Sequence, residues 1–235
     1  MELIDLFELL PLGGLRELQR KLQYVTGTPA FKLCLVYENP WWQNFTDNTG
    51  AKKGWTDGYS VTDLPVRQVF YGMGMGPVTE GNQRVLLATY ADTDAALYWE
   101  GLAQVSSNVP RLQEGAKFVQ AGPGKLVRAV ERQLCALLQI NGPLPQPLFA
   151  GFMNWAADPY GGAWHEWQPG VNLISAIPEM RQPIPGLPVY LCGEAYSWVQ
   201  AWIEGALMSA ERMLEDHFQL PRPTGWLPAD YDLGP

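Results

Sequence analysis

One run of eight residues, Ala30 to Tyr37, constrains the fold of this chain more than any other segment. Its residues are branched, aromatic or small, and both faces of the run are apolar apart from Lys32. A strand that is apolar on both faces has to be covered on both, so this run predicts a buried strand within a sheet. Pro40-Trp41-Trp42 follows shortly afterwards and ends it.

Further patterns around this strand predict an α+β fold, built from helices and a mixed β-sheet. Apolar residues at helical spacing indicate amphipathic helices, and short runs of branched and aromatic residues indicate strands. Residues 43–65 show no periodicity, which is typical of a long surface loop. The other elements we expect are helices at 15–25, 92–104, 125–140 and 198–218 and strands at 68–71, 84–90 and 189–192.

Charge and composition disfavour several classes of function. Sixteen Lys and Arg stand against 24 Asp and Glu, and no basic run could neutralise a nucleic-acid backbone. Every apolar stretch is shorter than the roughly 20 residues of a membrane span. Three Cys and two His make a disulfide framework or a metal site a poor interpretation. Acidic residues at the start do not resemble a signal peptide, so a cytoplasmic location is expected.

Two glycine-rich segments fall short of the patterns that bind phosphate groups. Residues 72–76 have the wrong spacing for a dinucleotide fingerprint and are followed by Pro77. Residues 122–125 lack both the preceding Gly and the following Ser or Thr of a phosphate loop. We interpret the first as a turn and the second as a helix start. No complete Rossmann unit is therefore expected in this chain.

Several residues have both a structural and a functional interpretation. The stem of Lys32 could extend to solvent, or its ammonium group could serve a site on the apolar strand. Glu194 follows an expected strand and precedes a helix, where α/β sheets place ligands, but a Glu there also complements the helix dipole. Trp198 and Trp202 share a helical face, which favours core packing. A strip of small residues would permit close approach to that helix: Gly205, Ala206 and Ser209.

Three separated segments together resemble the C-terminal half of the flavin-dependent amine oxidase family, which includes monoamine oxidases and L-amino acid oxidases. The first segment, 31–42, has a Lys eight residues before a Pro-aromatic pair. The second runs from Asn154-Trp155 through Gly161-Gly162-Ala163-Trp164 to Pro169-Gly170. The third combines Gly193-Glu194-Ala195 with residues 200–206. The segments follow the order and approximate spacing of the family, so the combined match is more specific than any one motif.

The resemblance implies a reaction and a set of site residues. In such enzymes the substrate Cα–H delivers a hydride to flavin N5, and O2 reoxidises the flavin and gives H2O2. By resemblance, Lys32 holds a water near N5, while Trp164 and Trp202 flank the substrate nitrogen; these are the predicted catalytic residues. The residues expected to contact FAD are Gly193, Glu194, Gln200, Ala201, Trp202 and Ala163.

Two of these positions refine the expectation. Ala163 stands where some monoamine oxidases carry the Cys that links the flavin, so FAD is expected to be bound non-covalently. Trp202 replaces the Tyr that is common among monoamine oxidases, which favours the L-amino acid oxidase branch. The expected substrate is accordingly a small amine or amino acid.

The resemblance also implies a preceding half with the glycine-rich FAD-binding unit. We therefore expect a split, hetero-oligomeric oxidase in which a separate Rossmann-type chain shares the FAD. The expected division is a substrate-binding domain at 1–188, a strand and helix at 189–220 that complete the FAD-binding domain, and an irregular tail at 221–235. Alternatives are a processed fragment, a flavin-free scaffold subunit that retains the fold, and another flavin oxidoreductase of the same superfamily.

Overall fold

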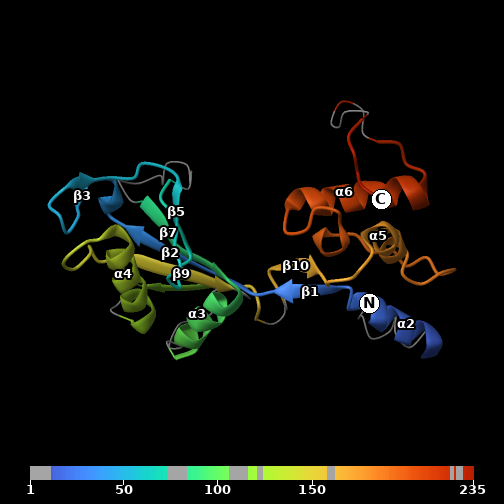
Figure 1. The fold of residues 1–235 in the computed structure, drawn as a ribbon, viewed down its shortest axis with the longest axis horizontal. Coiled ribbons are helices and arrows are strands. Elements are labelled where there is room, and N and C mark those ends of the chain that lie inside the picture. The colour runs from blue at the N-terminus through green and yellow to red at the C-terminus, as the bar shows by residue number, and fades with distance from the viewer. Residues whose placement is uncertain are drawn as a thin grey trace. The chain divides into compact units, whose positions relative to one another are not determined.

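The computed structural model describes residues 12–72, 84–105, 116–120, 124–157, 162–222, 225 and 230–235. The chain folds into two compact units (Figure 1). Residues 29–162 form the first, called here the sheet unit, and residues 1–28 with 163–235 form the second, called here the terminal unit. Parts of three expected motifs lie outside the described residues, namely 73–76, 122–123 and Gly161.

Among the described residues, the sheet unit is built on six strands, all paired antiparallel, so the expected mixed sheet is wrong. After β8 (Ala116–Gln120) the chain passes through helix α4 (Lys125–Leu138) and residues 139–148. It enters β9 (Phe149–Asn154) at the end of the sheet where β8 stops. This route gives β9 as an antiparallel neighbour, whereas a crossover to the far end would give a parallel one. The strand order is β5 (Tyr59–Val61), β6 (Gln68–Phe70), β7 (Arg84–Asp92), β2 (Ala30–Tyr37), β9 (Phe149–Asn154) and β8 (Ala116–Gln120).

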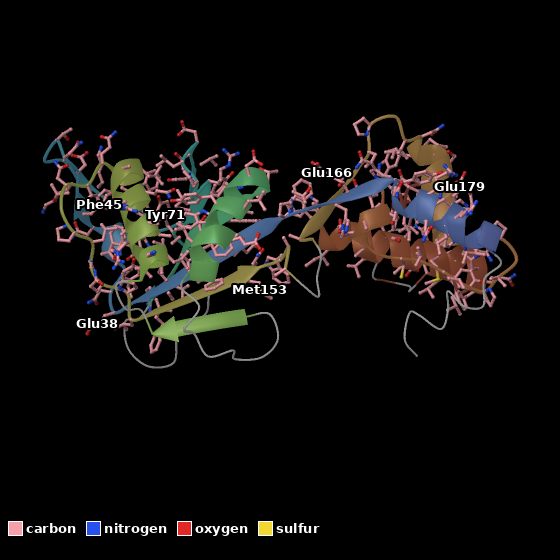
Figure 2. All side chains as sticks on the ribbon, turned by 90° about the horizontal axis from the view of Figure 1, so that it is seen from below. Glu38, Phe45, Tyr71, Met153, Glu166 and Glu179 are labelled. Carbon is pink, nitrogen blue, oxygen red and sulfur yellow. The ribbon has the colours of Figure 1, made fainter. Side chains whose placement is uncertain are left out.

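The core of this unit lies between the sheet and two helices, α3 (Thr93–Val105) and α4 (Lys125–Leu138). Both helices lie on one face of the sheet (Figure 2). Central strand β2 has the predicted bounds, and its residues alternate in burial. Phe31, Leu33, Leu35 and Tyr37 are fully buried, whereas Lys32, Cys34 and Val36 on the other face, called here the Lys32 face, are half-buried. The prediction of a strand buried on both faces thus holds for one face.

The expected surface loop at 43–65 contains more order than its composition indicates. After a short helix, η1 (Trp41–Gln43), strand β3 (Phe45–Thr46) pairs with β4 (Lys52–Lys53). Strand β5 then joins the edge of the main sheet. Trp42 anchors the start of this region, because its ring is buried and its Nε1 donates to the carbonyl of Tyr71 at 3.0 Å.

The terminal unit joins segments from both ends of the chain. Helix α2 (Leu12–Leu22) leads into β1 (Val25–Thr28), which pairs antiparallel with β10 (Trp164–Trp167). Helices α5 (Leu173–Arg181) and α6 (Ile203–Phe218) follow, with a 3-10 turn, η2 (Glu194–Tyr196), between them. The segment after α6 is attached to it, since Arg222 forms an ion pair with Glu215 and Leu233 is buried.

Two expected elements of this unit are wrong in place or type. Val189–Cys192 forms no strand, because among the described residues no neighbouring strand pairs with it; Leu191 N instead donates to Arg181 O at 3.1 Å. The helix expected from residue 198 begins only at Ile203. Ala201 is left-handed with φ 69°, and Trp202 is extended, so neither can continue a helix. Trp198 and Trp202 are 47% and 69% exposed, which rules out core packing.

The compact units do not follow the expected division at 188 and 220. That division describes how the chain would meet an FAD-binding chain, and it stays a prediction. In the described part of the chain, no helix is both long and apolar enough to cross a membrane.

Candidate functional site

The candidate site of the terminal unit is centred on residues 193–202, called here the Glu194 loop. The loop begins at Gly193, whose φ of 147° is open mainly to glycine. Gly193 N donates to Ser209 Oγ of α6 at 3.2 Å. A Cβ on Gly205 would lie 1.8 Å from the carbonyl oxygen of Val199, so only glycine lets the loop lie this close to α6. The close approach expected from the small residues of α6 is confirmed at Gly205 and Ser209.

The carboxylate of Glu194 is held at both oxygens. His165 Nδ1 on β10 lies 2.5 Å from Oε1, and Ala201 N donates to Oε2 at 2.8 Å. The second bond bridges seven residues within the loop and stabilises the left-handed conformation of Ala201. The side chain of Glu194 is 23% exposed, so it is sheltered but still accessible to a ligand.

Other bonds hold the loop backbone against β10. Gln200 Oε1 accepts from Trp167 N at 2.9 Å, and its Nε2 donates to Ala195 O at 2.6 Å. Trp167 Nε1 donates to Ser197 O at 3.2 Å, and the edge of its ring packs on Tyr196. Burial raises the pKa of the Tyr196 phenol. Each such hydrogen bond contributes about 0.5–1.5 kcal/mol net, so together they fix the loop on the strand.

Trp164 and Ala163 lie at the start of β10, beside the end of β1. Ala163 N donates to Thr28 O at 3.0 Å. Since strand side chains alternate, Trp164 projects from the face of β10 opposite to His165 and Trp167. Among the residues that the structure describes, no ring contact joins Trp164 to Trp202. Their shared role around a substrate nitrogen stays a prediction.

Lys32 belongs to the sheet unit and has an aromatic partner there. Its Nζ lies 4.3 Å from the centroid of the Tyr90 ring, directly across the β2–β7 pair. Such a cation–π contact contributes about 0.5–1 kcal/mol when exposed and more when desolvated. A row of rings extends from Tyr90 through Phe70 to Tyr59, with centroid distances of 6.3 and 5.1 Å. Met153, labelled in Figure 2, is the neighbour of Lys32 on β9.

Burial also affects Cys34, the next residue on the Lys32 face. It raises the pKa of the Cys34 thiol, an effect that Lys32 partly offsets. The thiol is therefore protonated and neutral at neutral pH, and Cys34 contributes polarizable, uncharged surface beside Lys32.

The start of α6 is exposed, apolar and uncapped. Trp202, Ile203 and Leu207 are 69%, 81% and 60% exposed. Among the described residues, no side chain caps its first turn. A sheltered carboxylate, an uncapped helix start and an exposed indole follow one another along this part of the chain. They can accept hydrogen bonds from hydroxyl groups, donate to an acceptor and pack on a flat ring, respectively. Nowhere in the described ranges do three His, Cys, Asp or Glu side chains gather as metal ligands.

Sequence reasoning missed the residues that position this site. His165 is 29 positions from Glu194, and Tyr90 is far from Lys32 in sequence, so neither contact follows from spacing. The alternation in Trp164-His165-Glu166-Trp167 is a usable signal, because it places His165 and Trp167 on one face of a strand. What that face meets depends on the position of the Glu194 loop, for which the sequence offers no pattern.

Comparison with known proteins finds one matching family model and several curated relatives. Residues 5–213 match the family model described as flavin containing amine oxidoreductase. Aplysianin-A of Aplysia kurodai is 29% identical over 83% of this chain and 34% of its own length. L-amino-acid oxidase 4 of Hebeloma cylindrosporum is 26% identical over 91% of this chain and 32% of its own length. A putative L-amino-acid oxidase of Bacillus subtilis is 26% identical over 86% of this chain and 35% of its own length.

The chain spans about a third of the length of these curated relatives. The family match covers most of the chain and includes both the strand of Lys32 and the loop of Glu194. This chain therefore belongs to the flavin containing amine oxidoreductase family.

Proposed function

We propose that this chain forms part of an FAD-dependent oxidase that oxidatively deaminates an L-amino acid or a related amine. The observation that carries the proposal is the Glu194 loop, where a carboxylate fixed at both oxygens lies next to an uncapped, apolar helix start. The matched relatives that are named as L-amino-acid oxidases support the substrate class.

FAD, when bound, would supply the redox chemistry by accepting a hydride from the substrate Cα–H and passing the electrons to O2, which yields H2O2. The residues of this chain would bind, orient and exclude water. Glu194 has lone pairs left to accept from hydroxyl groups of the ribityl portion, and the amides at the start of α6 would donate to the flavin ring. The remaining residues proposed to contact FAD are Gly193, Gln200, Ala201, Trp202 and Ala163.

Gln200 differs from the other residues proposed to contact FAD, because its side chain is already hydrogen-bonded within the chain. Both ends of its side-chain amide are bonded inside the chain, to Trp167 N and Ala195 O. Its proposed contribution is therefore to hold the loop in shape beside the cofactor.

Lys32, Trp164 and Trp202 are the proposed catalytic residues. The ammonium group of Lys32, held over Tyr90, would donate a hydrogen bond to a water and position it for the oxygen-dependent step. The two indoles would form apolar walls that keep water away from the substrate nitrogen and favour its uncharged form.

We also propose that a partner chain with the Rossmann unit shares the FAD with this chain. The exposed apolar start of α6 supports this, because large apolar side chains at 60–81% exposure are typical of a surface that another chain covers.

Purification of the chain through an affinity tag from its native source tests the proposal. We expect a companion chain, a flavin absorption spectrum in the complex, and H2O2 release with at least one member of a panel of L-amino acids and amines. The isolated chain should bind no FAD tightly. A complex without flavin would favour the scaffold alternative, and a flavin complex that oxidises no amine would favour another flavin oxidoreductase.

A further inference from the structure

We propose that His165 is a positioning residue for the cofactor, which holds the carboxylate of Glu194 in the orientation that binds FAD. This inference rests on the proposed function and extends it to a residue that the resemblance does not assign. The motivating observation is the 2.5 Å contact between His165 Nδ1 and Glu194 Oε1, across two segments of the terminal unit.

The contact acts on the carboxylate and not on the loop backbone. The backbone is already held by Gln200, by Trp167 Nε1 on Ser197 O, and by Gly193 N on Ser209. A Glu side chain on a fixed backbone can still rotate about its own bonds, and the bond to Ala201 N restrains only one oxygen. The hydrogen bond from His165 to the other oxygen, Oε1, fixes the plane of the carboxylate.

A fixed carboxylate plane sets the directions of the lone pairs that remain free to accept from a ligand. A carboxylate offers about four lone-pair directions, and His165 and Ala201 use two of them. The other two then point in set directions, which suits hydroxyl groups of a bound ribityl chain. Neutral His165 with its proton on Nδ1 suffices as donor, so the role requires no positive charge. A preorganised acceptor binds more tightly because the ligand does not have to order it.

The test uses the assembled, tagged complex, stripped of flavin and titrated with FAD while the quenching of flavin fluorescence is followed. His165→Leu removes the donor and should weaken FAD binding about tenfold or more, as expected for loss of a charge-assisted bond. His165→Asn places an amide NH2 at the position of Nδ1 and should restore binding to within about threefold of the wild type.

Two further variants separate positioning from a general loss of structure. Asn172→Ala removes the N-cap bond of α5, from Ile174 N to Asn172 Oδ1, in the same unit but outside the Glu194 loop. It should lower thermal stability but leave the FAD dissociation constant unchanged. On a Glu194→Gln background, His165→Leu should cost much less than it does alone, because its effect passes through Glu194.

The outcomes are distinct. If wild-type complex binds FAD and His165→Leu binds it equally well, the positioning role is wrong while the proposed function stands. If His165→Leu, His165→Asn and Asn172→Ala all weaken FAD binding equally, in proportion to their loss of thermal stability, His165 is only a structural contact. A wild-type complex that binds no FAD would overturn both proposals.

Discussion

The two units of the chain differ in how far each buries its own apolar surface. The sheet unit has one continuous core between β2, the neighbouring strands and helices α3 and α4, with Trp99 and Phe31 fully buried. The described part of the terminal unit has fewer buried apolar residues, including a small cluster of Leu18 and Ile184, and Ile203 is 81% exposed. Large apolar side chains left this exposed are typical of one part of a larger interface.

The difference assigns separate tasks to the two units. The sheet unit is a scaffold that supports Lys32 and a row of aromatic rings on one face. In the proposed function the terminal unit supplies the surface for the cofactor and the partner, because its loop is held by hydrogen bonds and its helix start is exposed. Substitutions in the buried core of the sheet unit should therefore affect folding, whereas substitutions at the start of α6 should affect assembly and chemistry.

The largest expected effect is on the stability of the sheet unit. Trp99→Ala should lower the free energy of unfolding by about 3–5 kcal/mol, because it leaves a cavity in the core. It also removes the bond from Trp99 Nε1 to the carbonyl of Pro65. Trp202→Ala, the matched control in the terminal unit, should change stability by less than about 0.5 kcal/mol. Urea denaturation followed by circular dichroism measures the free energy of unfolding of both variants. Similar decreases for the two variants would contradict the proposed difference between the units.

In the assembled complex, substitutions in the two units should slow different half-reactions. Lys32→Met should slow the oxidative half-reaction with O2 by about 100-fold, since a positioned group is lost, with little change in the reductive half-reaction. Trp202→Ala should mainly slow the reductive half-reaction with substrate, because an open wall admits water and loosens the geometry. Stopped-flow absorbance resolves the two steps. Small, equal changes in both steps for both variants would contradict the assigned roles.

A pair of glycines tests how tightly the Glu194 loop lies on α6. Gly205→Ala should destabilise the terminal unit by about 1–3 kcal/mol, because the new methyl group would overlap the carbonyl of Val199. Gly14→Ala on α2 has open space around it and should stabilise by about 0.5–1 kcal/mol through helix propensity. Hydrogen exchange of α6 and α2 amides reports each change. A stabilising Gly205→Ala would mean that the loop does not lie where we describe it.

The smallest expected effect is a pH dependence in the terminal unit. The hydrogen bond from Arg222 holds the pKa of Glu215 below its ordinary value of 4.5. A lowered pKa contributes stability that is present above pH 4.5 and is lost as pH falls through the lowered pKa. The difference in thermal midpoint between wild type and Glu215→Gln should therefore be constant near neutral pH and shrink in acid. A difference that grows in acid would refute this assignment.

Local sequence patterns predicted the bounds of those elements that begin and end at residues next to them in the sequence. The bounds of β2 match because an apolar run lies between two prolines, Pro29 and Pro40. Helix α4 begins at the predicted Lys125 and ends two residues early, at Leu138, where Gln139 is left-handed. In each case the turn or cap lies next to the element in sequence, where a pattern can detect it.

The other errors come from interactions between distant residues. Residues 189–192 are apolar enough for a strand, but a strand also needs a partner in space. The start of α6 is delayed because Glu194 binds Ala201 N and stabilises a left-handed alanine, which no helix rule anticipates. The contact of His165 with Glu194 belongs to the same group, since it spans 29 positions.

The central claim is that the open start of α6 is covered by a partner that brings FAD, and hydroxyl-radical footprinting tests it most directly. The oxidation rates of Trp202, Ile203 and Leu207 are compared between the isolated chain and the tagged complex. Trp55 of the sheet unit, 43% exposed, serves as internal reference. We expect strong protection of the three residues in a flavin-containing complex, with Trp55 unchanged. A flavin-containing complex in which Trp202 stays as reactive as in the isolated chain would contradict it.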